Sequence, residues 1–223
     1  MDVALELGKK RTFASALDWP GWCRSGKDEA SALQALFDHA LRYGQAIQTA
    51  SLGFEPPENA SAFVVVERLQ GNSGTDFGAP NVAPSIDASP VSDADLQRFK
   101  ALLQAFWLSF DTTVRAAEGK ELRKGPRGGG RDLERIIRHV LEAEMAYLTQ
   151  LGGKLKAEDK RSDPRKSFVP LRAAILTNLD AASRGELPRV GPRGGLRWTP
   201  RFFVRYSAWH ILDHTWEIED RLL

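Results

Sequence analysis

Residues 200–221, PRFFVRYSAWHILDHTWEIEDR, predict a helix that is apolar over most of its circumference. Pro200 suits the first turn, and we expect the helix to run to about the C-terminus. A helix that is apolar nearly all round is expected to be buried. One narrow sector differs, and it holds Phe203, His210, His214, Glu217 and Arg221. This stripe faces either a narrow strip of solvent or an internal polar site, and its two histidines favour the site.

Three further helices are predicted before this one. Apolar residues recur at helical spacing over about 92–118, 131–151 and 164–184. Ser92 and Asp93 suit a helix start, and Gly152-Gly153 a helix end. Four amphipathic helices with no strands between them predict a four-helix bundle over residues 92–223.

The first 70 residues have a different pattern. Alternating or β-branched residues predict strands at about 3–7, 12–17 and 62–69, and helical spacing covers 28–43. The predicted order is therefore β-β-α-β. Residues 71–91, rich in glycine and proline, are expected to be a linker. The whole chain is then an α+β protein: a small N-terminal module followed by an all-α bundle.

Composition narrows the class of protein. The chain has 223 residues, a net charge of +2 and a single cysteine, Cys23. Charge is uneven, with 7 basic and 11 acidic side chains in residues 1–91, against 24 and 18 in residues 92–223. There is no apolar run long enough to span a membrane, and the start MDVALELGKK lacks the features of a signal peptide. We therefore expect a cytoplasmic protein with no membrane contact.

Histidine placement predicts a metal site. Of four histidines, His139 falls on the second predicted helix of the bundle, and His210 and His214 fall one turn apart on the fourth. Histidines at i and i+4 share a helix face, and a third from a neighbouring helix would complete a set for one divalent ion. Zinc, nickel, iron or copper would suit such nitrogen ligands. Glu217 is a candidate for orienting a ligand or moving a proton, or else for a solvated salt bridge with Arg221.

Two segments carry a family resemblance. HVLEAEMAYL from His139 and YSAWHILDHTWEIEDRL from Tyr206 resemble the DinB/YfiT-like superfamily over about residues 92–223. The resemblance implies a four-helix bundle that binds a divalent metal through His139, His210 and His214 and often forms homodimers. It also implies a small-molecule substrate and a reaction such as transfer or isomerisation that uses a low-molecular-weight thiol, although many members have no known reaction.

The N-terminal module has a looser resemblance of its own. Its stretch FASALDWPGWCRSGKDEASALQALFDHAL, residues 13–41, is similar to the partial ribonuclease-H-like domain of HicB-type antitoxins. Such modules are reused in binding proteins, so the resemblance by itself assigns no activity.

A nearly repeated loop precedes two of the helices. GPRGGGR at 125–131 and GPRGGLR at 191–197 each combine glycines with arginine. Arginine binds carboxylates or phosphates with two hydrogen bonds. One hypothesis is a shared rim that binds an anionic substrate, which requires both loops to lie at the same end of the bundle. The alternative is a pair of solvated connectors. The candidate rim residues are Arg127, Arg131, Arg193 and Arg197.

The leading hypothesis is a divalent-metal-dependent transferase, isomerase or hydrolase. A second hypothesis is a non-catalytic binding or regulatory protein. A third is a nucleic-acid regulator related to toxin–antitoxin systems. The net charge of +2 does not favour it, and the sequence has no recognisable DNA-binding motif.

Overall fold

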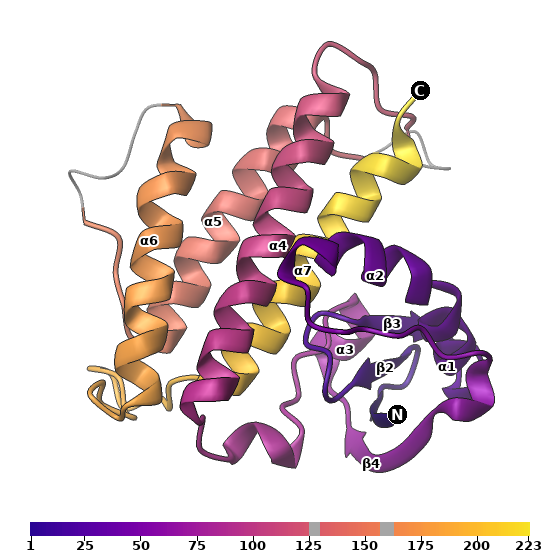
Figure 1. Cartoon of the computed structure of the whole chain (residues 1–223), viewed down its shortest axis with the longest axis horizontal. Coiled ribbons are helices and arrows are strands. Elements are labelled where there is room, and N and C mark those ends of the chain that lie inside the picture. The colour runs from indigo at the N-terminus through magenta and orange to yellow at the C-terminus, as the bar shows by residue number, and fades with distance from the viewer. Residues whose placement is uncertain (125–129, 157–162) are drawn as a thin grey trace.

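The computed structural model describes residues 1–124, 130–156 and 163–223. The chain is an α+β protein in which an N-terminal four-stranded sheet precedes four long helices (Figure 1). The strands are β1 (Asp2–Leu7), β2 (Thr12–Ala16), β3 (Cys23–Gly26) and β4 (Val64–Gln70). The helices are α1 (Glu29–Asp38), α2 (Ala40–Ile47), α3 (Ser73–Phe77), α4 (Asp93–Ala117), α5 (Leu133–Leu151), α6 (Pro164–Ser183) and α7 (Pro200–Arg221).

The sheet is mixed, and its strand order is β3-β2-β1-β4. β1 pairs antiparallel with β2 and parallel with β4, while β3 pairs antiparallel with β2. The predicted order β-β-α-β was therefore incomplete, because it lacked β3. That strand has the sequence CRSG, which offers one apolar residue and no alternation. Backbone pairing to β2, with Ser15 opposite Cys23, holds it instead.

The first predicted helix is divided into two. His39, with φ −97° and ψ 3°, separates α1 from α2. Its ring nitrogen Nδ1 lies 2.9 Å from the carbonyl oxygen of Ala35, and its ring packs against Trp216 at 5.2 Å between ring centres. The fourth histidine of the chain therefore has a structural environment away from the other three.

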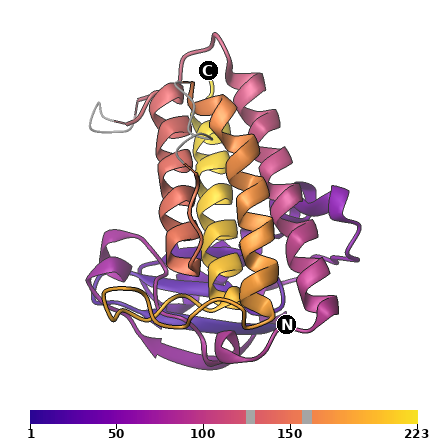
Figure 2. The same ribbon diagram turned by 90° about the vertical axis from the view of Figure 1, so that its left-hand side faces the viewer.

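The four long helices begin and end within about two residues of the predicted limits, and they lie side by side (Figure 2). Capping side chains explain the starts, because Ser92, Asp132, Asp163 and Thr199 each accept a hydrogen bond from a backbone N–H in the first turn.

The directions of these helices follow from contacts at their ends. The ends of α4 and α7 meet, since the backbone N–H of Arg123 donates to the carbonyl of Arg221, so these helices are parallel. α5 runs the opposite way, with Gly130 beside Arg221 and Gly152 beside Arg197. α6 runs parallel to α5, because their last residues meet near the start of α7.

The segment expected to be a linker is instead ordered and packed. It contains α3 and a 3-10 turn at Ser85–Ala88. Within that turn Asp87 is fully buried and forms an ion pair with Arg205 of α7, with 2.8 Å between Oδ1 and Nη2. The buried ion pair holds Asp87 against α7. Residues 71–91 are therefore packed between the sheet and the long helices and are not a free linker.

α7 is buried because it lies between the sheet module and the other helices. On one side Gly21 of the turn after β2 packs against Ala208, and Phe13 packs edge-on against Trp209 at 6.2 Å. Most buried apolar residues of both parts form one continuous core, and Phe13, Cys23 and Trp209 form a second, small cluster between the sheet and α7. In the described part of the chain, no helix is long and apolar enough to cross a membrane.

Candidate metal centre

α5 and α7 bring three histidines together where the two antiparallel helices pack. His210 and His214 lie one turn apart on α7, and His139 faces them from α5. One ring nitrogen from each lies within 4.8 Å of the others. The Nε2 atoms of His139 and His210 are 3.2 Å apart. His210 and His214 are buried, while His139 is partly exposed. His139 therefore gives the cluster a partly exposed side, whereas the two histidines on α7 are buried.

Glu217 orients the third histidine. Its Oε2 is 2.7 Å from Nδ1 of His214, and its Oε1 is 2.6 Å from Nη1 of Arg221. An ionised carboxylate only accepts hydrogen bonds, so Nδ1 of His214 carries a proton, and in the neutral ring Nε2 has the lone pair. Arg221 is held in turn by the backbone carbonyls of Arg123 and Arg131.

Burial and neighbouring charge keep His139 and His210 neutral, so their nitrogens can bind a metal ion. Burial, followed by the proximity of His214, lowers the pKa of both His139 and His210, and the pKa of His210 is well below its usual value. Burial alone would raise the pKa of Glu217, but the hydrogen bonds and charges of His214 and Arg221 hold it below its usual value. At neutral pH the imidazoles of His139 and His210 are therefore neutral, and the carboxylate is ionised.

These residues fit a divalent metal ion. Nitrogen ligands about 2.0–2.1 Å from one ion lie roughly 3–3.5 Å apart, close to the separation of the His139 and His210 nitrogens. The other ring nitrogen of His210, Nδ1, is buried with no hydrogen-bond partner among the described residues, so His210 lacks the support that Glu217 gives His214. Two Nε2 atoms that face each other across 3.2 Å can share one proton or direct two lone pairs at a cation. A carboxylate behind a ligating histidine is also the usual support of metal centres.

Aromatic side chains of α5 and α7 pack beside the cluster. Tyr147 packs edge-on against His210 at 5.4 Å and against Tyr206 at 5.1 Å. The two tyrosine hydroxyls share a hydrogen bond, and burial raises the pKa of both. Trp209, the residue before His210 on α7, has its ring centre 6.0 Å from that of His210 and packs against Phe13 of the sheet. Aromatic rings therefore pack directly against His210.

The two tyrosines were not predicted as site residues, although the spacing of one of them was informative. Tyr206 precedes His210 by four residues, about 40° around the helix, and Tyr147 follows His139 by eight, about 80° around it. Tyr206 therefore shares a face with its histidine, and Tyr147 lies on an adjoining one. A search for aromatic residues one or two turns from a metal ligand could have identified both.

The sheet module also reaches this end of α7. Arg24 of β3 forms an ion pair with Asp213, with 3.0 Å between Nη1 and Oδ1, and its guanidinium lies 5.3 Å from the ring centre of Trp216. The module thus lies directly beside the helix that carries two of the three histidines.

The candidate arginines do not form one rim. Arg127 lies outside the described residues. Arg131 lies at the start of α5, at the end of the helices where α7 finishes. The loop of Arg193 and Arg197 is at the opposite end, where α7 begins and Arg197 passes beside Gly152. Arg131 and Arg197 lie at opposite ends because α6 runs parallel to α5, so the chain enters α7 at the end where α5 finishes.

No protein-family model, curated protein or solved structure matches this chain.

Proposed function

We propose that the protein binds one divalent metal ion through His139, His210 and His214 and uses it in a transfer, isomerisation or hydrolysis reaction. The observation that carries the proposal is the convergence of three histidine nitrogens within 4.8 Å. The hydrogen bond from His214 to Glu217 supports it, because it leaves Nε2 of His214 free for the ion.

When bound, the ion would supply Lewis-acid chemistry to a substrate at the open side of the cluster. The chain's own residues would set the conditions for that chemistry. Glu217 holds the proton on Nδ1 of His214 and so keeps that ring in one tautomer and one orientation. Arg221 keeps the carboxylate ionised, and Tyr147 and Trp209 pack against His210 so that its ring is fixed.

The same proposal includes a DinB-like four-helix bundle joined to a HicB-like module. The side-by-side packing of α4–α7 and the sheet with α1 on its face are consistent with those resemblances. Under this proposal the substrate is a small molecule, and a low-molecular-weight thiol is the first co-substrate to test. The rings of Tyr147 and Tyr206, both partly exposed, would give such a substrate an aromatic surface near the ion.

Elemental analysis of untagged protein tests the site. We expect about one zinc, nickel, iron or copper ion per chain after purification or reconstitution. The His210→Ala/His214→Ala variant should lose the ion. His139→Gln provides a second test at a partly exposed position, in case the double variant folds poorly. His39→Gln is the matched control, since that histidine lies outside the cluster, and it should retain the ion.

Activity is measured once elemental analysis has shown which metal the protein binds. The loaded protein should accelerate a thiol-dependent transfer or a hydrolysis, and His139→Gln should abolish that rate while leaving the fold intact. Absence of metal after reconstitution, or equal metal content in the wild type and both cluster variants, would refute the proposal.

A further inference from the structure

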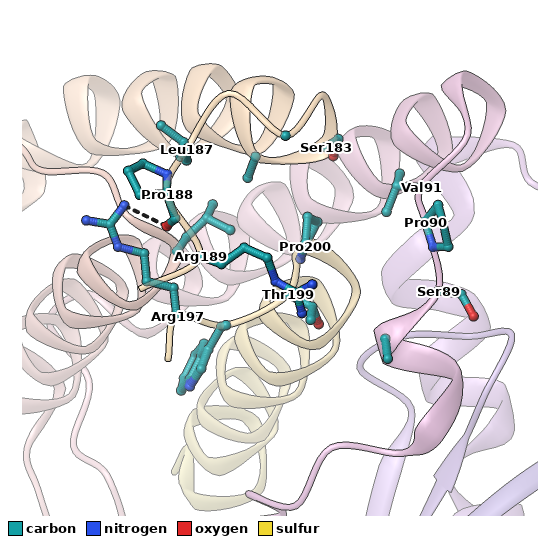
Figure 3. A pocket seen from close by; sticks show the side chains of 15 residues that line it. Ser89, Pro90, Val91, Ser183, Leu187, Pro188, Arg189, Arg197, Thr199 and Pro200 are labelled. Carbon is teal, nitrogen blue, oxygen red and sulfur yellow. Dashed lines mark hydrogen bonds between the residues drawn. The ribbon is translucent and has the colours of Figure 1, made fainter. Parts of the chain in front are cut away.

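A cavity of about 270 Å³ lies at the end of the long helices where α7 begins. Three segments enclose it: residues 88–91 before α4, the last turn of α6, and the loop that leads into α7 (Figure 3). Since α7 rises about 1.5 Å per residue, its entrance is roughly 15 Å along the helix from His210. The cavity is therefore separate from the three-histidine cluster.

Most of the cavity wall is apolar. Val91, Leu151, Leu187 and Trp198 contribute aliphatic and aromatic surface, and prolines complete it. Ligand sites in proteins typically combine such walls with a few convergent polar groups. This composition fits a ligand that has an apolar body.

The charged groups of the cavity are all of one sign. Arg189 and Arg197 line it, and no acidic residue does. Within the described chain, Arg189 forms no ion pair, and the Arg197 side chain donates only to the carbonyl of Pro188, at 3.2 Å. Figure 3 shows both side chains reaching from the loop before α7, with Arg197 directed at Pro188. Two arginines without carboxylate partners leave several N–H donors for an anion.

Ser183 at the end of α6 also lines the cavity. Its Oγ atom is buried and has no hydrogen-bond partner in the part of the chain that the structure describes, so it is not itself open to a ligand in this conformation. The two arginines are therefore the polar groups that carry the argument for a ligand.

We propose that this cavity binds a small organic carboxylate with an apolar body. Arg189 and Arg197 bind the carboxylate, and the apolar walls bind the remainder of the molecule. The cavity combines positive charge with an apolar wall, and this combination favours such a molecule over a bare inorganic anion. The proposal is independent of the metal centre, and it assigns a role to the second glycine–arginine loop that the metal site does not use.

Isothermal titration calorimetry with defined probes tests this site. The probes are benzoate and 4-phenylbutyrate, their neutral amides, and inorganic phosphate, each titrated into metal-free and metal-loaded protein. We expect the carboxylates to bind at least about tenfold more tightly than their amides and than phosphate, equally in both preparations. In nuclear magnetic resonance spectra of the ¹⁵N-labelled protein, the indole signal lost in Trp198→Phe should shift on binding.

Variants locate the binding. Arg189→Gln and Arg197→Gln should each weaken benzoate binding about tenfold. Arg193→Gln is the matched control, because Arg193 lies in the same loop, is exposed and does not line the cavity. Ala182→Phe adds bulk to the wall without changing charge, and it should block binding even if an arginine variant folds poorly. Equal binding of acid and amide, equal loss in Arg193→Gln, or no binding of either carboxylate would overturn the proposal.

Discussion

Arg205 of α7 donates two hydrogen bonds to the fully buried carboxylate of Asp87, at 2.9 Å from Nε to Oδ2 and 2.8 Å from Nη2 to Oδ1. The same guanidinium donates to the backbone carbonyls of Ala16 and Leu17 at the end of β2. One side chain therefore ties α7, the segment before α4 and the sheet together. This arrangement explains why a stretch rich in glycine and proline is not a free linker.

Removing the carboxylate of Asp87 should lower the stability of the folded protein. Asp87→Ala leaves the Arg205 charge buried without its partner, so we expect the free energy of unfolding to fall by about 3–5 kcal/mol. Urea denaturation followed by tryptophan fluorescence measures this. Arg68→Ala breaks an ion pair with Glu29 in which both side chains are 40% or more exposed, and it should cost less than about 1 kcal/mol. Similar costs for the two variants would contradict the structural role of Asp87.

Gly21 provides a second test of the contact between the sheet module and α7. Its φ of +92° is unfavourable for other residues, and a Cβ there would lie 2.8 Å from Cβ of Ala208. Gly21→Ala should therefore combine backbone strain with a steric clash and destabilise the protein by more than about 1 kcal/mol. Gly53→Ala is the control, because φ is +68° but no atom lies within 4 Å of the added Cβ. If contact matters, Gly21→Ala must be the more destabilising of the two in thermal unfolding.

Glu144 should make stability depend on pH. Burial raises the pKa of this carboxyl to about 7, and among the described residues only Oε1 has a partner, the indole N–H of Trp107 at 2.6 Å. The folded state therefore prefers the protonated form. Its contribution to stability is complete below the unfolded pKa near 4.5 and is lost as the pH rises through about 7.

Glu144→Gln mimics the protonated acid and removes this titration. Relative to the wild type, the variant should gain on the order of 3 kcal/mol of unfolding free energy between about pH 4.5 and pH 8. Chemical denaturation at a series of pH values measures the difference. A difference that does not change with pH would show that Glu144 is ionised in the folded protein.

Glu217 should tune metal affinity without being a ligand. Glu217→Gln weakens the support behind His214, and loss of such a partner typically lowers metal affinity 10–100-fold. Competition with a chromogenic chelator measures the dissociation constant directly. Glu142→Gln is the control, since that side chain is exposed on α5 one turn from His139, and it should leave the affinity within about twofold.

Metal binding should also stabilise the folded protein. An ion at 100 times its dissociation constant adds about 2.7 kcal/mol, so chelation should lower the melting temperature by several degrees. The His210→Ala/His214→Ala variant should show no such response to added metal or chelator. An identical response in wild type and variant would place the ion elsewhere on the chain.

The long helices were predictable because their signals are local. Each amphipathic stripe, and each capping residue such as Ser92 or Thr199, acts within a turn or two of its own position. β3 was not predictable in this way, since CRSG has no pattern of its own and depends on its partner strand. Tyr147 and Tyr206 were overlooked for a related reason: aromatic residues are common in helix cores, and only packing places these two beside His210.

The positions of the four long helices, and of three histidines on two of them, can be read from the residues, because periodicity of 3.6 residues sets which side chains share a face. Which ends of those helices meet depends on the folded structure. Had the helices alternated in direction, both glycine–arginine loops would lie at one end. Instead, Arg165 at the start of α6 pairs with Glu134 at the start of α5, so α6 runs parallel to α5. Arg131 therefore lies near the histidines, and Arg197 lies at the far end beside the cavity. Helix direction depends on long-range packing and on the path of a connection, neither of which leaves a periodic trace in the residues themselves.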